Sequence, residues 1–213
     1  MKPNAILNMK IIFLFTLVML LIGCRQSKSS KEFSSTSISG QNFYTIEAKD
    51  INDRAVKEAK NRNHDLAEDL FFKALEIEPK NPTILSNIGL NYEIQENARK
   101  AIEYYEKSLV ISDSTYLISA ANLGRLYYQN GRYSNGIKIL DFVIKNCREN
   151  KLLTIAHINR SFNQLGSGNC ENAQSDLNFV KHSISKSDEI NIQIERLEER
   201  IKNCVQSSKR VRL

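Results

Sequence analysis

The residues of this 213-residue chain best suited to chemistry are four cysteines and three histidines. They are Cys24, Cys147, Cys170, Cys204, His64, His157 and His182. Zinc sites are usually built from closely spaced cysteine or histidine pairs, and this spacing is absent. We also find no glycine-rich phosphate loop, no nucleophile elbow and no pair of carboxylates in a plausible cleft. The sequence therefore predicts no enzyme activity, no metal and no cofactor.

The composition favours a helical protein. Hydrophobic residues make up 41% of the chain and charged residues 25%, which is ordinary for a globular protein. Eight glycines and three prolines are few helix breakers for this length. The formal charge is +6, and loss of residues 1–23 with their two lysines would leave +4. This excess is too small to indicate nucleic-acid binding.

The start of the chain has the pattern of an export signal. Residues 1–10 hold two lysines and no acidic residue, and residues 11–22 are apolar apart from Thr16. Twelve helical residues rise about 18 Å, which is short of the roughly 30 Å hydrocarbon core of a bilayer. The pattern therefore predicts a signal peptide over residues 1–23.

The end of this segment, Leu21-Ile22-Gly23-Cys24, resembles the lipobox of bacterial lipoproteins. The resemblance implies cleavage before Cys24 and acylation of that cysteine with palmitate or similar chains, which would hold the protein on a membrane. Arg25 follows where many inner-membrane lipoproteins have aspartate, so we expect the outer membrane, facing the periplasm. The alternative is an ordinary signal peptide with an incidental cysteine.

The composition changes twice along the remaining chain. Residues 24–47 are rich in serine and poor in bulky apolar residues, which predicts a flexible linker. Over residues 48–186 the apolar spacing becomes helical, and features recur every 34 or 35 residues. Ile88-Gly89, for example, recurs as Leu123-Gly124.

These units resemble the tetratricopeptide repeat, a helix–turn–helix of 34 residues. Its pattern is a hydrophobic-glycine pair with an aromatic residue three positions later, then alanine, aromatic and alanine on the second helix. Residues 86–109 and 122–133 match best, whereas the first unit has Glu58 at the aromatic position and the fourth has Asn159 in place of glycine. The resemblance implies an all-α solenoid of about four stacked repeats, because each repeat alone leaves an apolar stripe uncovered.

Residues 187–205 predict a capping helix for this stack. One stripe is apolar at helical spacing, and it consists of Ile190, Ile194, Leu197, Ile201 and Val205. The other faces are charged, as the exposed side of a cap must be. A coiled-coil dimer is the alternative, although barely two heptads are present. Residues 206–213 form a basic tail, which we interpret as a solvated end.

The direction of the repeat helices predicts which cysteines pair. Cys170 lies in the turn of the fourth repeat, where first helices end, and Cys204 lies at the end of the capping helix. The two should therefore be neighbours, whereas Cys147 closes a second helix at the opposite end. We expect a Cys170–Cys204 disulfide if the protein is exported, with three free thiols as the alternative.

In tetratricopeptide-repeat proteins the first helices line a groove that binds peptides. The resemblance implies a partner-binding groove made of Asn87, Asn122, Arg125, Tyr128, His157 and Arg160. The two arginines occupy equivalent positions of neighbouring repeats, so we expect them side by side. The two asparagines match the residue that binds the ligand backbone or carboxylate in this family. Ordinary solvated surface residues are the alternative.

Taken together, the sequence predicts a lipoprotein of the bacterial cell envelope that acts as a protein–protein interaction scaffold. The partner would be an envelope protein or peptide, and the membrane would be contacted through acyl chains on Cys24. Two alternatives stay open: a protein that binds glycan or peptidoglycan fragments, and an accessory subunit of an envelope enzyme or secretion complex.

Overall fold

The computed structural model describes residues 43–183 and 187–210, with side chains up to Ser208. All the regular structure in these residues is α-helical, which confirms the predicted fold class. The helices are α2 (Ile46–Lys60), α3 (His64–Ile77), α4 (Pro82–Ile94), α5 (Ala98–Ile111), α6 (Leu117–Gln129), α7 (Tyr133–Asn146), α8 (Asn150–Gly166), α9 (Cys170–His182) and α10 (Asp188–Arg210). The predicted signal peptide, Cys24 and the linker up to residue 42 lie outside the described residues.

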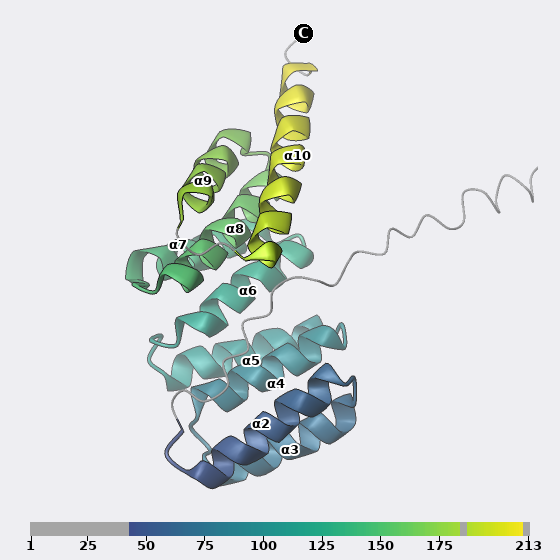
Figure 1. Cartoon of the computed structure of the whole chain (residues 1–213), viewed down its shortest axis with the longest axis vertical. Helices are drawn as coiled ribbons and strands as arrows, with labels where there is room; N and C mark the ends of the chain where they lie inside the picture. The colour runs from purple at the N-terminus through teal and green to yellow at the C-terminus, as the bar shows by residue number, and fades with distance from the viewer. Residues whose placement is uncertain (1–42, 184–186, 211–213) are drawn as a thin grey trace, which may run out of the picture. The chain divides into compact units, whose positions relative to one another are not determined.

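The first eight of these helices form four antiparallel pairs (Figure 1). In each pair a short turn connects the first helix to the second, which runs back alongside it. The pairs are α2–α3, α4–α5, α6–α7 and α8–α9. First helices also contact the first helices of the next pair, and α10 packs on both α8 and α9. The predicted solenoid of four repeats with a final helix is therefore confirmed.

Glycine residues at the contact let the two helices of a pair approach closely. A Cβ atom on Gly89 of α4 would lie 2.9 Å from the ring of Tyr105 on α5. At the equivalent place one repeat later, a Cβ atom on Gly124 of α6 would lie 2.4 Å from Leu140 on α7. Both contacts are closer than non-bonded carbon atoms tolerate, so only glycine fits between these helices.

The turn inside each repeat is built in the same way. One residue in each turn has the left-handed backbone conformation: Arg62 (φ 67°), Glu96 (φ 62°), Gly131 (φ 70°) and Gly168 (φ 81°). A left-handed residue after a helix ends it and redirects the chain into the next helix. The first two repeats accept this conformation without glycine, which the sequence pattern does not reveal.

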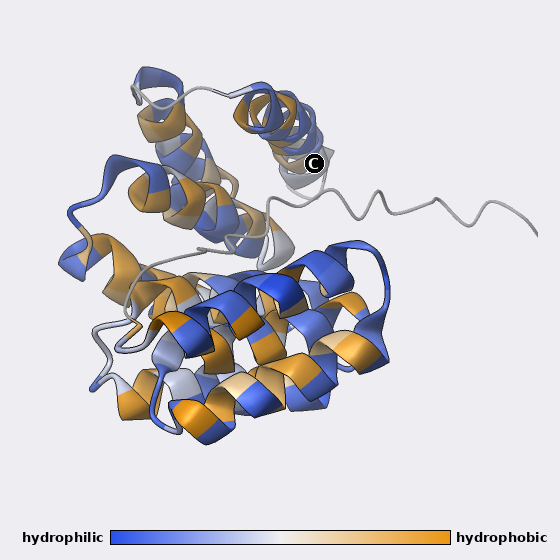
Figure 2. Ribbon diagram, turned by 60° about the horizontal axis from the view of Figure 1, so that its bottom comes forward, coloured by the Kyte–Doolittle hydropathy of each residue, from blue (hydrophilic) through white to orange (hydrophobic). Residues whose placement is uncertain are grey.

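Each helix buries one side. Hydrophobic and hydrophilic segments alternate around the helices, as Figure 2 shows, and this is the pattern of amphipathic helices packed on neighbours. The largest side chains with less than 2% exposure include Phe71, Tyr105, Leu140 and Leu177, which come from α3, α5, α7 and α9. The core thus runs between first and second helices through all four repeats.

Two predicted boundaries differ from the structure. Helix α2 begins at Ile46, two residues before the predicted start of the repeats, with the Thr45 side chain as its N-cap. Helix α10 does not stop at 205 but continues to Arg210, since no glycine or proline interrupts it. Val205 is 38% exposed rather than buried. No helix within the described ranges is long and apolar enough to cross a bilayer.

A disulfide fastens this last helix to the repeats. It joins Cys170, the first residue of α9, to Cys204 of α10, with Cα atoms 5.8 Å apart. This is the pair indicated by the helix directions. Cys147 is a buried free thiol at the end of α7.

Loss of the disulfide should lower the thermal stability of the protein. It closes a loop of 34 residues, which corresponds to about 3 kcal/mol. We expect Cys204→Ser to lower the melting temperature by about 6–12 °C, as followed by circular dichroism. Reductant should lower the wild-type melting temperature to the same value and leave the variant unchanged. A variant that melts like the oxidised wild type would contradict the bond.

Candidate partner-binding face

Arg125, a predicted groove residue on α6, is buried and forms an ion pair within the protein. Its guanidinium donates two hydrogen bonds to the Glu93 carboxylate of α4, at 2.5 and 2.9 Å. Both side chains are 6% exposed. The Tyr105 hydroxyl of α5 donates to the same carboxylate at 2.9 Å, and burial together with Glu93 raises the pKa of Tyr105 well above its usual value. The second and third repeats are thus joined by a buried ion pair.

Arg160, the equivalent residue on α8, binds other carboxylates. Its Nε and one terminal nitrogen donate to Asp176 of α9 at 3.0 and 2.6 Å, and the other terminal nitrogen donates to Asp141 of α7 at 2.6 Å. Burial alone would lower the pKa of Arg160, but the two carboxylates outweigh it and raise the pKa. The side chain remains 23% exposed, so one edge of this cation reaches solvent.

His157 also faces the second helix of its own repeat. Its Nδ1 lies 2.7 Å from the Asp176 carboxylate, and its ring stacks on Phe179 of α9 with centroids 3.8 Å apart. The residue is only 8% exposed. No group of three histidines, cysteines or carboxylates in the described part of the chain could hold a metal ion.

The two predicted asparagines belong to a polar row on the first helices. Asn52, Asn87 and Asn122 occur at intervals of 35 residues on α2, α4 and α6, and all three are buried. The Asn87 side-chain nitrogen donates to the Asn52 side-chain oxygen at 3.0 Å. The Asn122 side-chain nitrogen has no hydrogen-bond partner among the described residues. Sequence reasoning missed Asn52, although the same spacing identifies it.

Tyr128 of α6 is half-buried, because its ring packs on those of Phe162 of α8 and Tyr133 of α7, with centroids 5.5 and 5.9 Å away. Arg200 of α10 donates a hydrogen bond to the Tyr128 hydroxyl. The Arg200 guanidinium also lies 5.8 Å from the centre of the Tyr128 ring and 5.6 Å from that of Phe162, which is the range of a cation–π contact. The contact of Arg200 with Tyr128 could not be predicted from the sequence, because 72 residues separate the two.

The sequence predicts that Arg125 and Arg160 lie side by side as ligand-binding cations. In the structure each is instead paired with carboxylates of the protein itself. Arg125 turns toward α4, whereas Arg160 turns toward α7 and α9. Their spacing places both on the same side of consecutive first helices, but it does not reveal the carboxylates opposite them. Of the predicted groove residues, Tyr128 and Arg160 keep part of their surface in contact with solvent.

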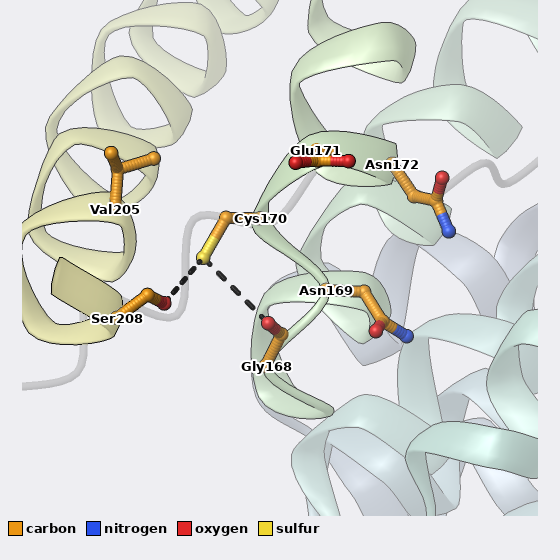
Figure 3. A pocket seen from close by; sticks show the side chains of 7 residues that line it. All are labelled: Gly168, Asn169, Cys170, Glu171, Asn172, Val205 and Ser208. Atoms are coloured by element: carbon orange, nitrogen blue, oxygen red, sulfur yellow. Dashed lines mark hydrogen bonds between the residues drawn. The ribbon is translucent and has the colours of Figure 1, made fainter. Parts of the chain in front are cut away.

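A surface cavity of about 420 Å³ lies elsewhere, beside the disulfide (Figure 3). Its lining residues are Gly168, Asn169, Cys170, Glu171, Asn172, Val205 and Ser208. Oxygen atoms of Ser208 and Gly168 each lie 3.6 Å from the Cys170 sulfur. Because a disulfide sulfur has no proton, Ser208 is the donor and the Gly168 carbonyl is only a contact. With Glu171 as its one titratable side chain, this lining offers no acid–base pair.

Comparison with known proteins agrees with the architecture. The family model described as tetratricopeptide repeat matches residues 82–114, which are α4, α5 and the turn after them. No curated protein sequence gives a match.

Solved structures resemble the fold over most of its length. One is pilF of Pseudomonas aeruginosa, with 17% identity, a TM-score of 0.61 and coverage of 76% of this chain and 74% of that one. Another is MamA of RS-1, with 11% identity, a TM-score of 0.57 and coverage of 77% and 97%. A third contains TPR-like repeats from Podosopora anserina, with 16% identity, a TM-score of 0.55 and coverage of 77% and 97%. At these identities the likeness concerns the fold alone.

The buried ion pair predicts a strong coupling between Glu93 and Arg125. Arg125→Met or Glu93→Gln alone should lower the free energy of unfolding by about 3–5 kcal/mol, because each leaves a buried group without its partner. The double variant should lose much less than the sum of the two, as measured by urea unfolding.

The exposed pair of Glu103 and Lys107 on α5 provides the matched control. Lys107→Met should change the free energy of unfolding by less than about 1 kcal/mol, since the pair is solvated. If Arg125→Met cost no more than Lys107→Met, Arg125 would not be a structural residue and would again be a candidate for ligand contact.

Proposed function

Because this chain is a tetratricopeptide-repeat protein, we propose that it is a lipid-anchored interaction scaffold of the bacterial cell envelope. Tetratricopeptide repeats suggest a protein–protein interaction scaffold, and the described residues form four of them. In this proposal the chain performs no chemistry of its own. It holds an envelope protein or peptide in place while acyl chains on Cys24 hold the scaffold on the outer membrane, facing the periplasm.

The observation that carries the location is the Cys170–Cys204 disulfide. Disulfides persist in oxidising compartments such as the bacterial periplasm and are rare in the cytosol. A chain that begins with a charged segment, an apolar run and Gly23-Cys24 has the features of export to that compartment. The bond and the start of the sequence are independent of each other, and both support the same location.

The partner contact is assigned to side chains that the fold leaves accessible. Tyr128 and Arg160 are partly exposed on α6 and α8, and Arg200 is exposed on α10. The Tyr128 ring with the Arg200 guanidinium beside it suits an extended peptide with acidic groups, because cations bind carboxylates and rings pack on apolar side chains. Arg160, which is already paired with Asp176 and Asp141, adds one partly exposed edge. Helix α10 therefore belongs to the binding face as well as to the cap.

Crosslinking in intact cells, followed by membrane extraction and mass spectrometry, tests this assignment. We expect one envelope protein to co-purify in stoichiometric amount with the wild type. Arg200→Glu should reduce that amount at least tenfold, because the new negative charge would repel an acidic segment. It should lower the melting temperature by no more than about 4 °C, since the exposed cation–π contact that is lost contributes about 1 kcal/mol.

Lys73→Glu is the matched control, since Lys73 is an exposed cation on the second helix α3. It should capture the partner as the wild type does. Equal capture by the Arg200→Glu variant would place the contact elsewhere. No protein partner under several crosslinkers would favour the glycan-binding alternative.

A further inference from the structure

Three large apolar side chains in the first two repeats project into solvent. Tyr44, Ile46 and Val110 have exposed fractions of 91%, 79% and 78%, and no other large hydrophobic residue in the described ranges exceeds 50%. Ile111, next to Val110, is 39% exposed. These residues form two short clusters of exposed apolar side chains, one at the start of α2 and one at the end of α5, and exposed apolar surface of this kind can mark a contact site.

A series of hydrogen bonds shows that these residues lie at the same end of the repeats. The Tyr44 backbone nitrogen donates to the Glu78 carboxylate at 2.9 Å, and the Asn81 side chain donates to the same carboxylate at 2.6 Å. The Ser108 hydroxyl then donates to the Pro82 carbonyl at 2.8 Å. The starts of α2 and α4 and the ends of α3 and α5 therefore meet there (Figure 1). We call Tyr44, Ile46, Val110 and Ile111 the tether-end patch.

Glu78 fixes the backbone at the point where the chain enters this patch. It is 6% exposed and also accepts hydrogen bonds from the Thr45 backbone and hydroxyl. Burial alone would raise the pKa of the Glu78 carboxyl, but hydrogen bonds from Asn81, Thr45 and Tyr44 outweigh it and lower the pKa. The contact is therefore fully formed at neutral pH and weakens only when the pH falls through that lowered value.

The chain that leads from the predicted lipid anchor at Cys24 reaches this patch at Tyr44, just before α2 begins. Nineteen residue steps separate Cys24 from Phe43 (43 − 24), and Tyr44 is the next residue. A chain of that length spans at most about 70 Å when fully extended. If Cys24 is held on a membrane, the patch is within reach of that membrane, and the tether raises its effective concentration there.

We propose that the tether-end patch inserts into the interfacial layer of the membrane to which Cys24 is anchored. The proposal rests on the acyl anchor of the proposed function. Tyrosine is favoured at the boundary between lipid headgroups and acyl chains, and the neighbouring aliphatic side chains gain by leaving water. Exposed charges of both signs, such as Lys80, Glu47 and Asp113, occur near the same helix ends. We therefore expect the insertion to depend on apolar contact, with little requirement for anionic lipid.

Depth measurements with a nitroxide label test the insertion. The full acylated protein, carrying Val110→Cys, is labelled and reconstituted in vesicles of phosphatidylethanolamine and phosphatidylglycerol. Gln129→Cys is the matched control, because Gln129 is exposed at the opposite end of α6, where the first helices end. We expect the label at 110 to collide more with oxygen and less with a soluble nickel chelate than the label at 129.

A second variant separates insertion from anchoring. Ile46→Asp, added to the Val110→Cys protein, should return the label at 110 to the collision rates of the label at 129 while the protein still floats with the vesicles. Equal rates for the two labels in a floating, acylated protein would overturn the insertion and leave the anchor intact. A protein that does not float and carries no acyl chain would instead refute the proposed anchor. Burial of the label in cells but not in vesicles would also overturn insertion, in favour of a protein partner.

Discussion

The buried ion pair between Glu93 and Arg125 is the constraint on which the middle of the molecule depends. Two charges with 6% exposure are tolerated only because each is paired and because Tyr105 donates a further hydrogen bond. This requirement fixes how the second and third repeats sit against each other. The junction of the third and fourth repeats is satisfied in a similar way, since the side-chain nitrogen of Asn163 donates to the Gly124 carbonyl at 3.0 Å.

Such junctions explain why the architecture could be predicted and the roles of polar residues could not. The spacing of Gly89 and Gly124 identifies the close helix pairs, because a side chain there would collide with the next helix. Helix direction alone brings Cys170 and Cys204 together. Arg125, by contrast, pairs with a carboxylate 32 residues away. Periodicity places Arg125 on the predicted groove side of its helix, but it does not show that the Glu93 carboxylate lies within reach.

The hydrogen bonds between repeats limit the polar side chains of the first helices that remain for a partner. Polar side chains on the first helices, among them Asn87, Arg125 and Asn163, hold neighbouring repeats together. The groups that stay accessible and are assigned to the partner are Tyr128, Arg160 and Arg200. The disulfide keeps α10 in place. The tether-end patch lies in the first two repeats, at the start of α2 and the end of α5. The account thus assigns membrane contact to the first two repeats and partner contact to the later ones.

Export of the scaffold and its anchoring through Cys24 can be tested by the mass of the mature N-terminus. The protein is extracted from membranes, digested and examined for its first peptide. The account predicts a peptide that begins at Cys24 and carries acyl chains, with residues 1–23 absent. A mature chain that begins at Met1, or an unmodified Cys24, would contradict it.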